Sequence, residues 1–180
     1  MVILIAGASH TGKTLLAQRL LEKYRYPCLS IDHLKMGLIR SGQTALTPAD
    51  DDALTDYLWP ILREMVKTAV ENRQNLILEG CYIPPDWRKD FGPEYLASIR
   101  FLCLAFTETY VEANFGEILR HASDIEARLA DGDCTPARLK AENRSVAARF
   151  AAAGEPVTLI GSDYAGTLNA LLEQPFPETP

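Results

Sequence analysis

The sequence predicts an α/β fold of three layers, in which a five-stranded parallel sheet lies between two layers of helices. Short apolar runs alternate along the chain with longer segments of helical periodicity, a pattern typical of a parallel sheet covered on both faces. The length of 180 residues suits five strands, and we expect residues 1–180 to form a single domain. The five runs are rich in Val, Ile, Leu or Phe and span 2–6, 27–31, 75–78, 99–106 and 157–160.

The first half of the chain predicts two long helices between these runs. Residues 13–24 carry leucines at helical spacing and follow the first run after a short glycine-containing segment. Residues 53–72 also repeat apolar side chains at helical spacing, and Pro48 and Asp50 mark a start for this helix, because acidic charge is favourable near the positive end of a helix. Pro60 interrupts the pattern, so we expect this helix either to kink or to divide into two.

The second half of the chain predicts three further helices and a frayed tail at 175–180. Thr135 can cap the middle helix and Pro136 can occupy its first turn, because a hydroxyl accepts hydrogen bonds from first-turn N–H groups and proline needs no donor there. The three helices span 109–122, 136–153 and 163–172.

The composition indicates a soluble globular protein, with 47% apolar and 23% charged residues. A net charge of −6 gives no general attraction to nucleic acid or to an anionic membrane, so we expect neither as a partner. The N-terminal apolar run is too short for a signal peptide and lacks a basic start. No stretch approaches the ~18 apolar residues that a membrane span needs. We therefore expect a cytoplasmic protein.

The four cysteines are scattered and show no CxxC spacing, so neither a disulfide framework nor a zinc site is expected. Cys28 and Cys103 lie in apolar runs, where a buried thiol is the usual state, and we expect both to be buried. The other two are Cys81 and Cys134.

The segment after the first run, Gly7-Ala8-Ser9-His10-Thr11-Gly12-Lys13-Thr14, matches the phosphate-binding motif GxxxxGK[ST] at every fixed position. We call residues 7–14 the phosphate loop. Its two glycines permit a backbone that turns N–H groups inward around a phosphate, and the helix that follows adds its positive N-terminal end. Lys13 can neutralise the β- and γ-phosphates, and the Thr14 hydroxyl can bind Mg²⁺. The loop therefore predicts binding of ATP with Mg²⁺.

The rest of the sequence favours a small kinase over other users of this motif. A GTPase needs a base-recognition segment of the NKxD kind, and the chain has none. The sole DxxG, at residues 163–166, follows the last strand, where no switch loop would lie. Motor and chaperone ATPases would carry two acids after a hydrophobic strand, whereas the third run here ends in the single acid Glu79 followed by Gly80.

Three segments together resemble the nucleoside monophosphate kinase superfamily, above all its adenylate kinase-like, zeta-toxin-like and 2-phosphoglycerate-kinase-like members. These are the phosphate loop, Ser30-Ile31-Asp32-His33-Leu34-Lys35 after the second run, and Leu78-Glu79-Gly80 after the third. The resemblance implies the P-loop NTPase fold with a small helical lid. It also implies ATP- and Mg²⁺-dependent transfer of the γ-phosphoryl group.

The same resemblance suggests residues for the acceptor. In that group the second strand commonly ends in Asp-x-Leu-Arg, which is used for acceptor binding, and Asp32 and Lys35 match its first and last positions. Lysine departs from the pattern, because it offers a point charge and not a bidentate fork. Arg40, a little further along the same predicted helix, can take over this role, so we include it with Lys35 among the acceptor-binding residues.

Two carboxylates are expected beside the phosphate loop, because ligands of open α/β sheets bind outside the carboxyl ends of the strands. Asp32 could accept the proton of an acceptor hydroxyl or bind Mg²⁺ through water. Alternatively, it caps a helix over residues 33–39. Glu79 could bind Mg²⁺ through its outer hydration shell and help to bind the substrate, or it could be structural.

The resemblance places a lid between the fourth and fifth strands, and we expect it at 123–141. Phosphoryl transfer needs cations around the moving group and exclusion of water. Most arginines of this region should be solvated, but we expect one or two to clamp phosphates. The candidates are Arg120, Arg128 and Arg144, with Arg128 acting in catalysis. An ordinary surface connection is the alternative to a lid.

The expected function is transfer of the γ-phosphoryl group from ATP to a small-molecule acceptor, either a nucleoside monophosphate or a sugar- or glycerate-type metabolite. Tyr82 and Trp87 could line the acceptor pocket, or Trp87 could pack against the next helix. Two alternatives stay open, a nucleotide-binding regulator that does not turn over a small molecule and a zeta-toxin-like kinase. The sequence leaves the acceptor and the oligomeric state undetermined.

Overall fold

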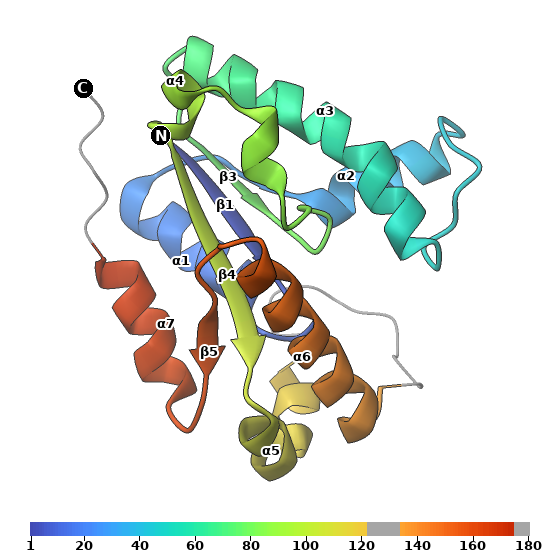
Figure 1. Ribbon diagram of the computed structural model, residues 1–180, viewed down its shortest axis with the longest axis vertical. Helices are drawn as coiled ribbons and strands as arrows, with labels where there is room; N and C mark the ends of the chain where they lie inside the picture. The colour runs from blue at the N-terminus through green and yellow to red at the C-terminus, as the bar shows by residue number, and fades with distance from the viewer. Residues whose placement is uncertain (122–133, 175–180) are drawn as a thin grey trace.

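The computed structural model describes residues 1–121 and 134–174 and contains one sheet of five parallel strands with helices on both faces (Figure 1). The strands lie in the order β2-β3-β1-β4-β5, so β1 is central and β2 and β5 form the edges. Each predicted run coincides with one strand to within one residue or two, and the predicted α/β fold is confirmed. The strands are β1 (Val2–Gly7), β2 (Cys28–Ser30), β3 (Leu76–Glu79), β4 (Ile99–Phe106) and β5 (Thr158–Ile160).

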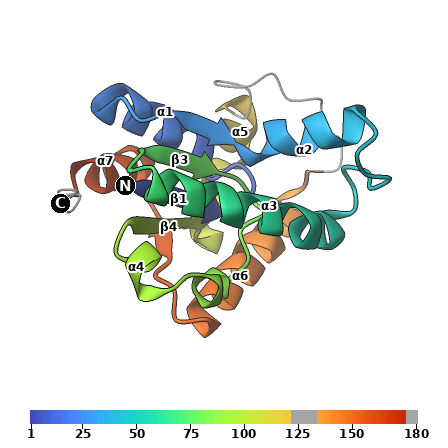
Figure 2. The ribbon, with the colours of Figure 1, turned by 90° about the horizontal axis from the view of Figure 1, so that it is seen from above.

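Helices bury both faces of the sheet, and successive residues of β1 point to opposite faces. Leu4 belongs to the core cluster formed with α3, whereas Ile3 and Ile5 belong to the cluster formed with α1. Figure 2 shows α1 on one side of the sheet and α4 and α6 on the other. The helices are α1 (Lys13–Tyr24), α2 (Ile31–Arg40), α3 (Asp51–Glu71), the 3₁₀ helix η1 (Trp87–Asp90), α4 (Pro93–Leu96), α5 (Glu108–Arg120), α6 (Pro136–Ala152) and α7 (Tyr164–Glu173).

Helix α3 is continuous over 21 residues, although Pro60 lies inside it. Of the two alternatives expected at Pro60, division into two helices is therefore wrong. Pro60 is exposed, while Leu58 and Leu62 beside it are fully buried against the sheet. Most helical stability in proteins comes from packing an apolar face, and that packing holds the helix together through the proline.

The N-terminal caps agree with the sequence for α6 and differ for α2. The Thr135 hydroxyl accepts a hydrogen bond from the Arg138 backbone N–H at 3.2 Å, as predicted. Helix α2, however, begins at Ile31 with Ser30 in the cap position. Asp32 therefore lies within the first turn, and the alternative in which it caps this helix is wrong.

One of the two predicted buried thiols is exposed. Cys103 lies in β4, next to the central strand, and is fully buried, which raises the pKa of its thiol to about 12. Cys28 lies in β2 and is exposed, so the prediction for it is wrong. The physical reason is the position of β2 at the edge of the sheet.

Trp87 is part of the core and does not line a pocket. It begins η1, is fully buried, and its ring centroid lies 5.9 Å from that of Phe91 and 5.3 Å from that of Phe101. Aromatic pairs at such separations stabilise a core beyond the area they bury. The packing alternative for Trp87 is therefore confirmed, and the pocket-wall alternative is wrong.

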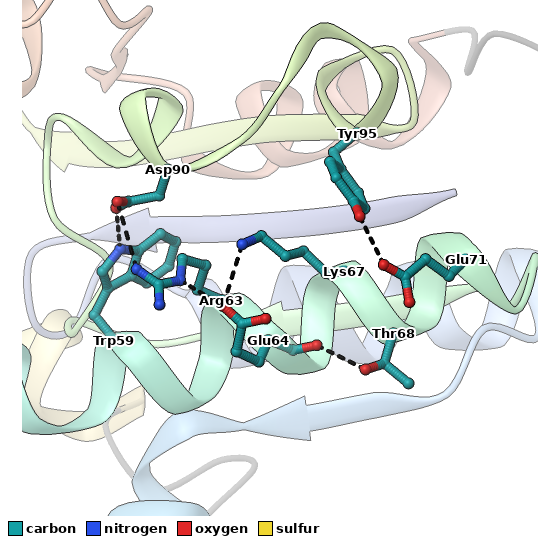
Figure 3. A network of polar contacts seen from close by, with 8 residues as sticks. All are labelled: Trp59, Arg63, Glu64, Lys67, Thr68, Glu71, Asp90 and Tyr95. Atoms are coloured by element: carbon teal, nitrogen blue, oxygen red, sulfur yellow. Dashed lines mark hydrogen bonds and ion pairs between the residues drawn. The ribbon is translucent and has the colours of Figure 1, made fainter.

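Polar side chains attach α3 to the connection between β3 and β4 (Figure 3). Trp59 Nε1 donates to Asp90 Oδ2 at 2.7 Å, and the Arg63 guanidinium lies 3.6 Å from the other oxygen of that carboxylate. Further along the helix, the Tyr95 hydroxyl donates to Glu71 Oε1 at 2.6 Å. These contacts fix η1 and α4 against α3, so the segment that leaves the sheet after Glu79 follows a defined course.

Candidate phosphate-binding active site

The phosphate loop joins the end of β1 to the start of α1 and is attached to the neighbouring strand β4. The Ala8 backbone N–H donates to the Leu104 carbonyl at 3.1 Å. Inside the loop, the Ala8 carbonyl accepts from the Thr11 hydroxyl at 2.8 Å and from Lys13 Nζ at 2.7 Å. Lys13 is 7% exposed, so its charge is held within the loop, beside the backbone N–H groups and the positive end of α1.

Both glycines of the motif are required by their surroundings. Gly7 has a φ of 140°, and a Cβ on it would lie 2.2 Å from the Leu104 carbonyl oxygen. Gly12 has a φ of 85°, and a Cβ on it would lie 2.0 Å from the hydroxyl of Tyr164. Side chains are thus excluded at both ends of the loop, on one side by β4 and on the other by the first residue of α7.

Replacement of Gly7 by alanine is expected to destabilise the fold by roughly 2–6 kcal/mol, from about 1–3 for the strained backbone and about 1–3 for overpacking. The Leu104 carbonyl cannot move aside easily, because it accepts the Ala8 N–H. Urea unfolding measures the change. Gly116→Ala is the matched control, since a Cβ there meets nothing within 4 Å. Equal stability of the Gly7 variant and the wild-type chain would contradict the close approach to β4.

Thr14 and Glu79 lie side by side, as expected from the positions of their elements. The Thr14 hydroxyl donates to Glu79 Oε2 at 3.3 Å, and Glu79 is 2% exposed at the end of β3. Ser30, opposite Glu79 in the register of β2 and β3, has a buried hydroxyl that makes no hydrogen bond to the described residues. Hydroxyl and carboxylate oxygens are the ligands that Mg²⁺ prefers, directly or through water, so this group of side chains fits Mg²⁺.

Asp32 and Lys35 form a polar cluster with Tyr82 at the start of α2. The Lys35 ammonium donates to Asp32 Oδ1 and, at 2.9 Å, to the Tyr82 hydroxyl, which in turn donates to Asp51 Oδ1 at 3.2 Å. Burial disfavours the charged form of Lys35, but its hydrogen bonds to Asp32 and Tyr82 outweigh this and raise its pKa. Burial also raises the pKa of Tyr82 to about 12. The cluster connects α2, the start of α3 and the segment after β3.

The two members of this cluster with predicted functions differ in exposure. The Lys35 side chain is 11% exposed and the Asp32 side chain 41% exposed. Asp32 is therefore accessible to a ligand at the carboxyl edge of the sheet, whereas Lys35 is enclosed by its partners. Lys35 accordingly orients the Asp32 carboxylate through its hydrogen bond.

Three of the four arginines predicted to bind phosphate or acceptor are among the described residues. Arg40 is the last residue of α2, about 12 Å along the helix axis from Asp32, and is exposed. Arg120 donates to both carboxylate oxygens of Glu117, at 2.7 and 2.6 Å. Arg144 Nε donates to Glu108 at 2.7 Å. Arg128 lies outside the described residues.

The predicted lid at 123–141 is described from residue 134 onward, and its earlier part lies outside the described residues. Cys134 lies near the phosphate loop, with its Sγ 3.9 Å from Nε2 of His10. Two residues further on, α6 begins and runs across the carboxyl end of β4.

Two polar residues of α6 help to build the site, and no sequence motif predicted either of them. Asn143 is 1% exposed, accepts from the Phe106 backbone N–H at 2.6 Å and donates to the Leu139 carbonyl at 2.8 Å, which fixes α6 to the end of β4. Its neighbour Glu142 accepts a hydrogen bond from the Ser9 backbone N–H of the phosphate loop at 2.7 Å. Neither residue belongs to a motif, and in the sequence both are ordinary polar positions of an alanine-rich helix.

The sequence matches no protein-family model and is similar to no curated protein. Solved structures with the same fold are found nonetheless. Deoxyadenosine kinase from M. mycoides has a TM-score of 0.57 at 12% identity, covering 97% of this chain and 98% of its own. Shikimate kinase from Bacteroides thetaiotaomicron has a TM-score of 0.54 at 12% identity, with coverages of 96% and 97%. A sugar kinase from a Janibacter species has a TM-score of 0.52 at 15% identity, with coverages of 95% and 91%.

These similarities extend over nearly the whole chain. They show that its fold is the fold of the small P-loop kinases. The site agrees with this fold, because the phosphate loop, Asp32 and Glu79 follow or end the strands β1, β2 and β3 at the carboxyl edge of the sheet, where Thr14 contacts Glu79. Within residues 1–121 and 134–174, no helix is both long enough and apolar enough to cross a membrane.

Proposed function

We propose that the protein is an ATP- and Mg²⁺-dependent kinase that transfers the γ-phosphoryl group to a small molecule. The observation that carries this proposal is the complete phosphate loop with the Lys13 ammonium buried inside it, next to the Thr14–Glu79 pair. An ammonium and inward N–H groups at one point suit a polyphosphate, which carries several negative charges that need local compensation. A chain with a net charge of −6 supplies no such compensation through its overall field.

The residues of the site have distinct roles in this mechanism. The loop N–H groups and Lys13 bind the β- and γ-phosphates and stabilise the charge that develops on the transferred group. Thr14 and Glu79 would hold the Mg²⁺ that accompanies the nucleotide, which would neutralise charge on the phosphates. Asp32 accepts the proton of the acceptor hydroxyl while the hydroxyl oxygen forms a bond to the γ-phosphorus. At the same time the bond between the γ-phosphorus and the bridging oxygen breaks, and ADP leaves.

A hydroxyl acceptor of the sugar or hydroxy-acid type fits the site better than a nucleoside monophosphate. A phosphate acceptor would need a cation near the end of β2, and the Lys35 ammonium there is engaged by Asp32 and Tyr82. Asp32, by contrast, is accessible, because its side chain is 41% exposed. The names of the three similar structures, a deoxyadenosine kinase, a shikimate kinase and a sugar kinase, agree with a small hydroxyl-bearing acceptor.

A panel of sugars, hydroxy acids, nucleosides and nucleoside monophosphates tests the proposal, with ADP formation from Mg-ATP as the measurement. We expect ADP to form with one class of hydroxyl acceptor, and Lys13→Ala prepared in the same way to give only background. Nucleotide binding without ADP formation for any acceptor would indicate a nucleotide-binding regulator. Formation of ADP at the same rate in the Lys13 variant would mean that a contaminating enzyme is responsible.

A further inference from the structure

The contact between α6 and the phosphate loop places the negative charge of Glu142 at the loop, where the negatively charged phosphates of the proposed ligand would bind. Glu142 Oε1 lies 2.7 Å from the Ser9 backbone nitrogen, the distance of a charge-assisted hydrogen bond. The N–H groups of such a loop are the donors that hold phosphate oxygens. A carboxylate oxygen and a phosphate oxygen are both anionic acceptors, so they compete for the same donor.

The position of Glu142 is set by the packing of α6. Asn143, next to it, is 1% exposed and bonded to the end of β4. On the outer side of the same helix, Lys140 donates to Glu112 at 2.6 Å and Arg144 pairs with Glu108, both on α5. Helix α6 is thus attached at one end of β4 and along α5, and this attachment directs Glu142 onto the loop. The side chain itself is half-buried, so it can rotate away into solvent without disturbing the attachment.

We propose that Glu142 competes with nucleotide for the phosphate loop, because its carboxylate takes up a phosphate-binding N–H and must leave when a polyphosphate binds. The inference rests on the proposed function of the phosphate loop. Before a nucleotide binds, the contact satisfies the Ser9 N–H and holds α6 close to the loop. When a nucleotide binds, the Glu142 carboxylate faces like charge at short range and moves to solvent. The affinity for nucleotide is therefore lower than the loop alone would give.

The test is calorimetric titration of Mg-ATP into the wild-type chain, Glu142→Gln and Glu142→Ala. Glutamine keeps an acceptor for the Ser9 N–H but removes the charge, and alanine removes both. A hydrogen bond to a charged group contributes about 1.5 kcal/mol, which corresponds to about tenfold in affinity. We therefore expect Glu142→Ala to bind Mg-ATP about tenfold more tightly, and Glu142→Gln to show a smaller gain because its amide oxygen can still accept from the Ser9 N–H. Glu173→Gln is the matched control. It removes one negative charge that pairs with Lys23, at the end of α1 opposite the loop, and the variant should bind as the wild-type chain does.

Inorganic tripolyphosphate in place of ATP locates the effect at the phosphates. The gain in Glu142→Gln should persist with this ligand, because it has no nucleoside. Equal or weaker Mg-ATP binding in the Glu142 variants, or a gain with ATP but none with tripolyphosphate, would overturn the inference. A gain of the same size in Glu173→Gln would also overturn it, since overall charge would then explain the effect.

The outcomes also separate this inference from the proposed function. Binding by the wild-type chain that Lys13→Ala weakens, with no change in the Glu142 variants, would leave the phosphate site intact and remove the competitor. No binding of Mg-ATP or tripolyphosphate by any variant would overturn both.

Discussion

Replacement of Lys13 by alanine is expected to abolish most nucleotide-dependent stabilisation and to lower phosphoryl transfer by about 10³-fold or more. The Lys13 ammonium is buried in the phosphate loop and would be the cation nearest the β- and γ-phosphates. Binding to the folded state alone stabilises a protein by about 2.7 kcal/mol at a ligand concentration of 100 Kd, which corresponds to roughly 5–10 °C in Tm for a chain of this size. Thermal unfolding with and without Mg-ATP measures this shift.

Lys23→Ala is the matched control for this experiment. Lys23 lies at the opposite end of α1 and pairs with Glu173. The Lys23→Ala variant should therefore show the wild-type Mg-ATP shift in Tm and the wild-type transfer rate. An Mg-ATP shift of the same size in Lys13→Ala and in the wild-type chain would remove the loop as the nucleotide site.

Replacement of Asp32 by asparagine is expected to lower transfer by at least about 10²-fold while the Mg-ATP shift in Tm is retained, because general bases contribute about 10²–10⁴-fold. Asparagine preserves the shape of the side chain and can still accept a hydrogen bond from Lys35, but it cannot take a proton. The carboxylate is 41% exposed and lies at the carboxyl end of β2, where an acceptor would bind. Single-turnover transfer rates and thermal shifts, measured on the same preparations, separate the two effects.

Lys35→Met distinguishes a base from a structural partner. If Asp32 acts only by holding Lys35, loss of either side of the pair should have the same effect on transfer. If Asp32 is the base, Lys35→Met should have the smaller effect, since it leaves the carboxylate in place and only removes its neighbour. Transfer by Asp32→Asn within tenfold of the wild-type rate would contradict the role of Asp32 as a base.

The layout of the sheet could be predicted from sequence because its strands are buried on both faces and therefore read as continuous apolar runs. What the runs do not encode is which strand lies at an edge, and for this reason Cys28 was wrongly expected to be buried. At Pro60 the pattern left open a kink or a division into two helices, and packing of the neighbouring leucines on the sheet keeps the helix continuous. In both cases long-range packing determined the outcome.

The residues of the candidate site also fall into two groups, those that local sequence predicts and those that long-range packing places. The phosphate loop is local in sequence, and the Thr14–Glu79 contact follows from the rule that carboxyl ends of parallel strands meet at one edge. Glu142 and Tyr164 reach the loop from distant helices, and neither belongs to a motif that could have identified it. Their positions depend on how α6 and α7 pack, which periodicity alone does not determine.

Transfer of label from ATP carrying ³²P in its γ-phosphate tests the central claim most directly. The wild-type chain, given Mg²⁺ and a mixture of small hydroxyl-bearing metabolites, should move the label into a new small-molecule phosphate ester that chromatography separates from ATP and inorganic phosphate. Lys13→Ala should leave the label in ATP. Label that stays in ATP with the wild-type chain, or that appears only as inorganic phosphate at the rate of the Lys13 variant, would contradict the account of this protein as a kinase.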